Sequence, residues 1–224
     1  MPAHVLQLVT DRLEARLPLE EAVARAVLGG VDLVQVREKG APADTVLRAV
    51  RQALSACDGS AAVVVNDRVD VAMAARAAGV HLARRSLPPD LARTLLPASE
   101  GWLVGVSVHS VEEARAAAEA GADYVTFGHV FPTGSKPGLP PRGLADLASV
   151  VAAVTLPVLA IGGIGPENVA AVLATGCAGV AVISAVLGAA DPGAAAGALR
   201  RAMDAAGRPP AHALRVAGRE VPRR

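Results

Sequence analysis

The chain alternates short β-rich runs with Ala-rich helical segments along most of its length. Several of the β-rich runs are continuously apolar, which is typical of strands buried on both faces of a parallel sheet. The eight candidate strands cover residues 5–10, 31–38, 61–67, 79–82, 102–109, 124–131, 157–163 and 179–185. Eight strands with interleaved helices in about 200 residues predict an α/β fold, a single-domain (β/α)8 TIM barrel over residues 1–204.

The segments between these runs carry helix start and stop signals. The clearest helical segments are residues 18–30, 42–54, 68–79, 110–121 and 165–176. Ser110 is expected to cap the fourth segment, with Glu113 at the capping-box position. Pro166 and Glu167 are expected to open the fifth. The alternative fold, a doubly wound open sheet, usually has a Gly-rich turn after its first strand, and none follows residues 5–10.

Composition excludes several classes of function. With 22 Lys and Arg against 21 Asp and Glu, the formal net charge is +1, and aromatic residues make up 2% of the chain. Neither value favours a nucleic-acid partner. No run of 18 apolar residues lacks a charged or polar break, and the N-terminus lacks the order of a signal peptide. We therefore expect a cytoplasmic protein that does not enter a membrane.

Two smaller features complete the organisation of the chain. Cys57 and Cys177 lack metal-ligand spacing, so we expect both to be reduced core residues. Residues 205–224 lose the helical period and gain Pro and Arg, which predicts a flexible C-terminal tail.

Polar residues gather at the predicted carboxyl ends of the strands, where barrels build their active sites. At the seventh and eighth strand ends, glycines would let backbone N–H groups approach an anion, and the following helix adds its dipole. This pattern predicts a phosphate site, although a tight strand-to-helix turn explains the same glycines. The residues of the predicted phosphate site are Gly162, Gly163, Ile183 and Ser184.

Four further residues at these ends have a functional and a plainer explanation. Asp67 suits either Mg²⁺ or the cap of the next helix. Lys39 and Lys136 suit diphosphate or carboxylate contacts, or exposed positions. His129 lies in an apolar run, as core histidines do, but a polar loop follows it, and an imidazole there can act as acid and base near neutral pH. His81 and His109 have weaker claims to such a role.

A series of motifs extends the argument over residues 5–190. In order, they read LVTD, VQVREK, NDRVD, GVHL, GVSVHS, GADYVTFGHVFPTGSKPG, IGGI and GVAVISA. They resemble the motifs of the thiamine phosphate synthase and TenI superfamily. The resemblance implies a (β/α)8 barrel and a small thiazole phosphate as substrate, and it is compatible with a homo-oligomer. The substrate-binding residues it implies, besides the phosphate site, are Gln35, Arg37, Lys39, Asn66, Ser107, Thr133 and Lys136.

Two positions favour the TenI branch of this superfamily. Synthases join a pyrimidine methyl diphosphate to a thiazole phosphate and hold Mg²⁺ with two carboxylates. Asp67 matches the first carboxylate, but Ser86 stands where the second is expected. TenI-like proteins carry FGHVF, so His129 matches their catalytic histidine. The resemblance thus implies a thiazole tautomerase, which aromatises thiazole carboxylate phosphate by proton transfer at His129, with no metal or other cofactor.

Two alternatives stay open. The substrate-binding residues at the second and third strand ends look synthase-like, so the chain is alternatively a transferase, a thiamine phosphate synthase with an altered Mg²⁺ site at Asp67. A third hypothesis is a non-catalytic regulator that binds thiazole phosphate. Such a protein would have no use for an imidazole at His129, which favours an enzyme.

Overall fold

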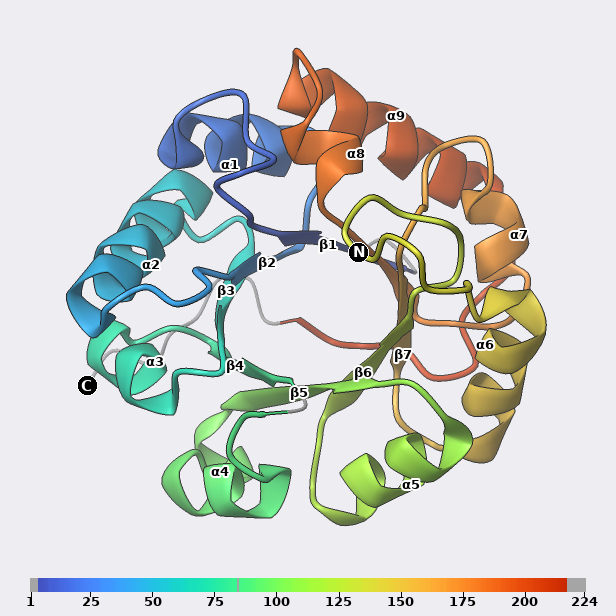
Figure 1. The fold of residues 1–224 in the computed structure, drawn as a ribbon, viewed down its shortest axis with the longest axis horizontal. Coiled ribbons are helices and arrows are strands. Elements are labelled where there is room, and N and C mark those ends of the chain that lie inside the picture. The colour runs from blue at the N-terminus through green and yellow to red at the C-terminus, as the bar shows by residue number, and fades with distance from the viewer. Residues whose placement is uncertain (1–3, 84, 217–224) are drawn as a thin grey trace.

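Eight parallel strands close into one barrel with helices around it (Figure 1). The computed structural model describes residues 4–83 and 85–216. The strands are β1 (Val5–Val9), β2 (Leu33–Val36), β3 (Ala62–Asn66), β4 (Gly79–Leu82), β5 (Leu103–Val108), β6 (Tyr124–Gly128), β7 (Val158–Ile161) and β8 (Gly179–Val182). Each predicted run contains one of them. Strand β8 pairs with β1 in the register Val5 with Gly179, which closes the ring. The predicted (β/α)8 barrel is confirmed.

Helices follow the strands and pack against their outer faces. They are α1 (Leu19–Leu28), α2 (Ala43–Cys57), α3 (Val69–Ala75), α4 (Pro89–Leu95), α5 (Val111–Glu119), α6 (Gly143–Ala153), α7 (Val169–Leu173), α8 (Ser184–Leu187) and α9 (Pro192–Ala205), with a 3₁₀ turn at Ala98–Glu100. Ser110 caps α5 as predicted, because its hydroxyl accepts from the Glu113 N–H at 3.2 Å.

Helix α7 begins later than the sequence suggested. Pro166 and Glu167 were expected to open it, but the first helical residue is Val169. The Asn168 side chain accepts from the Gly165 N–H at 3.0 Å and donates to the Gly163 carbonyl at 2.9 Å. These two bonds hold the segment before Val169 as a turn, in competition with a helical turn.

The apolar residues form two layers. The larger one lies between the outer faces of the strands and the helices. The smaller one fills the barrel interior near the amino ends of the strands, and its buried members are Val5, Leu33, Ala62, Val64, Tyr124, Leu159 and Ala178. Strands with apolar neighbours on both faces explain the continuous apolar runs in the sequence.

Above this apolar floor, the barrel interior becomes polar. Side chains along a strand alternate between the two faces, so the residue two positions after a floor residue also points inward. Gln7 follows Val5, Gln35 follows Leu33, and Thr126 follows Tyr124 in this way, and all three are buried. The polar column therefore begins inside the barrel and leads toward the carboxyl ends of the strands.

Arg200 of α9 ties the amino ends of the first two strands together. Its guanidinium donates to the carbonyls of His4, at 2.9 Å, and Gly30, at 2.9 Å and 3.2 Å, and it pairs with the Asp32 carboxylate. Asp32 also accepts from the Leu6 N–H at 2.8 Å. One side chain thus links the last helix to β1 and to the start of β2.

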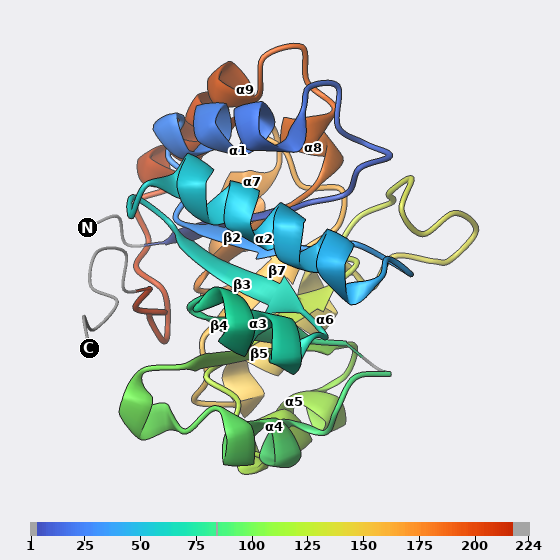
Figure 2. The same cartoon turned by 90° about the vertical axis from the view of Figure 1, so that its left-hand side faces the viewer.

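The segment after α9 lies on the same amino-end face (Figure 2). The Ala211 N–H donates to the Gly176 carbonyl at 2.9 Å, and Leu214 and Val216 pack against the interior apolar cluster. Residues 206–216 therefore contact the bottom of the barrel, while residues 217–224 lie outside the described residues. The flexibility expected for residues 205–224 stays a prediction.

Two sequence expectations about composition can also be compared with the fold. Cys57 and Cys177 are buried free thiols, and burial raises the pKa of Cys57 to about 12. Among the helices of residues 4–83 and 85–216, none is both long and apolar enough to cross a membrane.

We expect Arg200→Met to lower the free energy of unfolding by about 2–4 kcal/mol, because it removes the charged partner of the Asp32 carboxylate and the donor to two carbonyls. Urea unfolding measures this loss. Arg25→Met is the matched control, since Arg25 pairs with Glu21 and both side chains are nearly half exposed, at 46% and 44%. Its effect should stay below about 0.5 kcal/mol. Equal losses in the two variants would contradict the role of Arg200 as a tie.

Candidate active site

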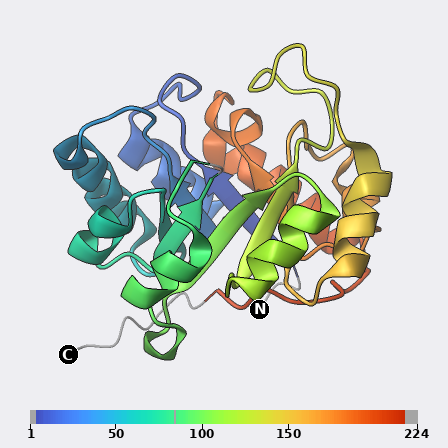
Figure 3. The same cartoon turned by 60° about the horizontal axis from the view of Figure 1, so that its bottom comes forward.

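A cavity of about 910 Å³ opens at the carboxyl ends of the strands. The loop between β6 and α6 extends away from the barrel (Figure 3), and Thr133, Ser135 and Lys136 of this loop line the cavity. All the residues that the sequence predicted for catalysis or substrate binding line this one cavity. They are Gln35, Arg37, Lys39, Asn66, Ser107, His129, Thr133, Lys136, Gly162, Gly163, Ile183 and Ser184. Their contacts with substrate stay predictions.

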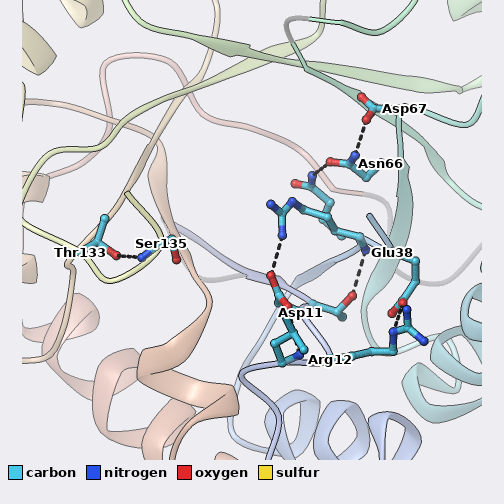
Figure 4. A network of polar contacts seen from close by, with 11 residues as sticks. Asp11, Arg12, Glu38, Asn66, Asp67, Thr133 and Ser135 are labelled. Atoms are coloured by element: carbon cyan, nitrogen blue, oxygen red, sulfur yellow. Dashed lines mark hydrogen bonds and ion pairs between the residues drawn. The ribbon is translucent and has the colours of Figure 1, made fainter. Parts of the chain in front are cut away.

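On the side of β2 and β3, side-chain amides form a chain of hydrogen bonds. The Gln35 amide donates to Asn66 Oδ1 at 2.7 Å, and the Asn66 amide donates to Asp67 Oδ2 at 2.7 Å (Figure 4). Beside this chain, Arg37 pairs with Asp11 at 2.8 Å. Each donor points toward the next acceptor, so the chain ends on the Asp67 carboxylate.

Asp67 itself does not line the cavity but lies just behind Asn66 and Ala83, which do. Its Oδ1 accepts from the Ala83 N–H at 3.1 Å and contacts the Ser86 hydroxyl. The Ser86 hydroxyl also accepts from the Ala83 N–H, at 2.7 Å. The Asp67 carboxylate and the Ser86 hydroxyl thus contact each other behind the cavity lining, and the described residues hold no group of three or more His, Cys, Asp or Glu side chains that could bind a metal ion.

Beneath Ser107, two aromatic side chains are buried in the barrel. The His81 ring lies between two hydroxyls, with Nδ1 3.1 Å from the Tyr124 oxygen and Nε2 2.9 Å from Ser107 Oγ. Burial lowers the pKa of His81 to about 4, with the Asp67 charge opposing the shift. Burial likewise raises the pKa of Tyr124, and a side-chain hydrogen bond with Gln7 opposes that shift. These groups are neutral hydrogen-bonding partners.

His129 follows the last residue of β6, where it is 8% exposed and lines the cavity. Its Nε2–H donates to the carbonyl of Leu139 at 3.2 Å. The His129 and Val130 carbonyls accept from the N–H groups of Arg142 and Gly143, at 2.9 Å and 3.1 Å. His129 therefore links the two ends of the loop that carries Thr133, Ser135 and Lys136.

Glycines at the end of β7 leave room for this loop. Gly162 has φ +102°, and a Cβ there would lie 2.4 Å from the Cβ of His129. Gly163 has φ +65°, and a Cβ there would lie 2.5 Å from the Pro132 carbonyl oxygen. Both positions require glycine for backbone and packing reasons. The β6 loop can therefore lie directly against the predicted phosphate site.

The charges that line the cavity favour an anionic ligand. The cations are Arg37, Lys39, Lys136 and Arg142, and the acidic residues are Glu113 and Glu167. Glu113 is already engaged by the His109 N–H at 2.6 Å. Ser135 and Arg142 were missed from the sequence. Ser135 stands between two residues that were singled out, whereas no motif marked Arg142.

Comparisons with known proteins show the family of this chain. The family model described as thiamine monophosphate synthase matches residues 6–186. A thiamine-phosphate synthase from Anaeromyxobacter dehalogenans is 52% identical over 82% of this chain and 83% of its own, and one from Methanoculleus marisnigri is 48% identical over 90% and 96%. The structure of thiamine phosphate pyrophosphorylase from Pyrococcus furiosus has a TM-score of 0.83 and 38% identity, over 92% of this chain and 98% of that one. These relatives support an enzyme.

The tautomerase expected from the sequence is wrong. Relatives at 52%, 48% and 44% identity are named thiamine-phosphate synthase, and the similar solved structure is a thiamine phosphate pyrophosphorylase. The expectation was wrong because the motif FGHVF specifies a histidine at position 129 but not its hydrogen-bond partners. In the fold, the donor nitrogen of His129 is engaged by the Leu139 carbonyl.

We expect Gly162→Ala to weaken the binding of inorganic phosphate by about ten-fold, because the new methyl group displaces His129 and the adjoining backbone. Isothermal titration measures this change. Gly197→Ala in α9 is the control, since the nearest atom to its new Cβ is the flexible end of Arg201, at 3.3 Å. Wild-type phosphate affinity in Gly162→Ala would count against a phosphate site at this strand end.

Proposed function

The chain belongs to the thiamine monophosphate synthase and TenI family, and we propose that it is itself a thiamine-phosphate synthase. The observation that carries the proposal is the pairing of two anion-compatible ends in one cavity. The side of β2 holds Arg37 and Lys39, and the side of β7 holds the glycine turn at Gly162 and Gly163, with the β6 loop and its Lys136 next to it. A reaction between a diphosphate and a monophosphate substrate needs both ends.

The proposed reaction is a substitution at the methylene carbon of a pyrimidine methyl diphosphate. The ring nitrogen of the thiazole phosphate forms a bond to this carbon, and the carbon–oxygen bond to the diphosphate breaks. The bonding electrons leave with the diphosphate, so the products are thiamine phosphate and pyrophosphate. No oxidant or reductant is required.

The protein's main task in this reaction is to stabilise a leaving group on which negative charge increases. Fixed cations in a partly enclosed cavity do this without reorganising at the moment of reaction. Lys39 and Lys136 come from opposite sides of the mouth, after β2 and after β6, so they can contact one diphosphate from two directions. The glycine turn then holds the phosphate of the second substrate, which orients its ring toward the first.

Mg²⁺ fits this site as a partner of the diphosphate. Mg²⁺ is usually bound by one or two carboxylates plus substrate phosphates, and it keeps several waters. The Asp67 carboxylate and the Ser86 hydroxyl would supply two oxygen ligands of the required kind, next to Asn66 and Ala83 of the cavity lining. When bound, Mg²⁺ would neutralise charge on the leaving diphosphate. Asp67 is held in place for this by the Asn66 amide and the Ala83 N–H.

The test of the function is to incubate the protein with both substrates and to measure thiamine phosphate and pyrophosphate. We expect the two products in equal amounts. Either substrate alone should give neither product. If both substrates bind but no thiamine phosphate forms, the proposal fails.

We expect chelation of Mg²⁺ to stop this reaction, and Asp67→Asn to lower kcat/KM by about 10²-fold or more, because the site then lacks its carboxylate. Ser86→Asp should retain the reaction and lower the Mg²⁺ concentration that gives half the maximal rate. Steady-state assays over a Mg²⁺ series measure both effects. Full activity of Asp67→Asn in chelator would contradict the metal assignment.

We expect His129→Asn to keep the coupling reaction within about ten-fold of wild type, because the change removes one hydrogen bond to the loop and no reacting group. The rate of thiamine phosphate formation measures it, beside His212→Asn as an exposed control. A loss of about 10³-fold would show that the imidazole takes part in the chemistry.

A further inference from the structure

We propose that Gln7, Tyr124 and His81 are positioning residues, which form a buried hydrogen-bond relay that makes the Ser107 hydroxyl a donor toward the cavity. The inference rests on the proposed function in one respect, since the group that receives this hydrogen bond is the diphosphate of the first substrate. None of the three relay residues was expected to have this role from the sequence.

The contact between Tyr124 and His81 is possible because the residue between them, on β5, is a glycine. Gly105 on β5 is the register partner of both His81 on β4 and Tyr124 on β6. A Cβ at Gly105 would lie 2.2 Å from Cζ of Tyr124 and 2.5 Å from its hydroxyl oxygen. The phenol ring therefore crosses β5 through the space that glycine leaves, and it reaches His81.

The direction of the hydrogen bonds follows from the donors available. The Gln7 amide donates one hydrogen to Gln35 Oε1 at 2.9 Å, and the Gln7 side chain lies close enough to the Tyr124 phenol to oppose the rise of its pKa. An amide nitrogen carries two hydrogens, so the second can go to the Tyr124 oxygen. The phenol then has its own hydrogen left to donate to Nδ1 of His81.

An imidazole whose Nδ1 accepts carries its proton on Nε2. That Nε2–H donates to Ser107 Oγ at 2.9 Å. The serine oxygen is thus an acceptor on its inner side, and its own O–H is left for the cavity that Ser107 lines. With the opposite tautomer, Nε2 of His81 would accept the hydrogen of the Ser107 hydroxyl. The serine oxygen would then present only lone pairs to the anion.

The same amide of Gln7 begins the second chain, through Gln35 and Asn66 to Asp67. One buried group therefore sets the polarity of both sides of the site. The chain on one side ends in an oxygen that accepts, where a cation suits, and the chain on the other side ends in a hydroxyl that donates, where an anion suits. The apolar floor below shows that this barrel interior can also be filled without polar groups.

The first test measures the tautomer directly and needs no turnover. Ring ¹⁵N chemical shifts distinguish a protonated from an unprotonated imidazole nitrogen, and His81→Gln identifies the His81 signals. We expect Nε2 protonated and Nδ1 bare in wild type, and a change of this pattern in Tyr124→Phe. A wild-type ring with Nδ1 protonated and Nε2 bare would overturn the relay.

The second test is a double-mutant cycle on the binding of inorganic pyrophosphate with Mg²⁺. We expect Tyr124→Phe and Ser107→Ala each to weaken binding by about ten-fold, because Ser107→Ala removes the hydrogen bond donated to the charged pyrophosphate and Tyr124→Phe removes the donor that orients it. Their combination should be no weaker than Ser107→Ala alone. His81→Gln should keep most of the affinity, since its amide can still donate to Ser107, whereas His81→Leu should not.

Leu159→Val is the matched control, because it loosens the apolar cluster that contains Tyr124 without touching the relay. It should leave pyrophosphate affinity unchanged. If Tyr124→Phe weakens binding equally with and without the Ser107 hydroxyl, its role is packing and the relay is rejected. Unchanged affinity in Ser107→Ala also rejects it. Neither test measures thiamine phosphate, so a failure of the proposed activity is a separate result.

Discussion

The interior of a closed barrel must be filled by the inward-facing side chains of its own strands, and this constraint organises the whole molecule. Only every second residue of each strand points inward, so a few positions decide what the interior contains. Near the amino ends, these positions are apolar and form a packed floor. One step further along the strands, they are Gln7, Gln35, His81 and Thr126, all of them buried. The site is the open end of this polar column.

Buried polar groups are costly unless they are paired, and most polar groups of the column are hydrogen-bonded to one another, although Thr126 Oγ1 and Gln7 Oε1 have no partner among the described residues. Glycines make the pairing possible across the sheet. Gly105 admits the Tyr124 ring between two strands, and Gly162 admits His129 and the loop that follows it. In both places a glycine on one strand leaves space for a side chain of the neighbouring strand. The geometry of the site therefore depends on these two glycines as much as on the polar side chains.

Much of this arrangement was predictable from the sequence. The carboxyl ends of parallel strands meet at one mouth, so residues as distant as Gln35 and Ser184 were expected together and do line one cavity. The partners of individual side chains were not predictable. His129 is hydrogen-bonded to Leu139, and Tyr124 to His81. Both contacts depend on where the side chains point in the folded chain, which a sequence motif does not specify. Arg142 likewise enters the cavity only because the β6 loop returns to His129.

The family branch was misjudged for a related reason. Ser86 and His129 were each compared separately with the motifs of the two branches. The binding of an anion depends instead on the summed charge of all the residues that line the cavity. Among the described residues, four cations and two acidic side chains line the cavity, and Arg37 is already paired with Asp11, so the protein balances part of the charge of a diphosphate. A diphosphate also supplies oxygen ligands of its own, so Mg²⁺ held between it and Asp67 does not require a second carboxylate. Ser86 in place of that carboxylate keeps an oxygen next to Asp67 and lowers the negative charge of a site that, in the proposed function, would hold two anions. Ser86 is therefore compatible with the proposed synthase function, in which the binding of the cation would depend more strongly on the diphosphate.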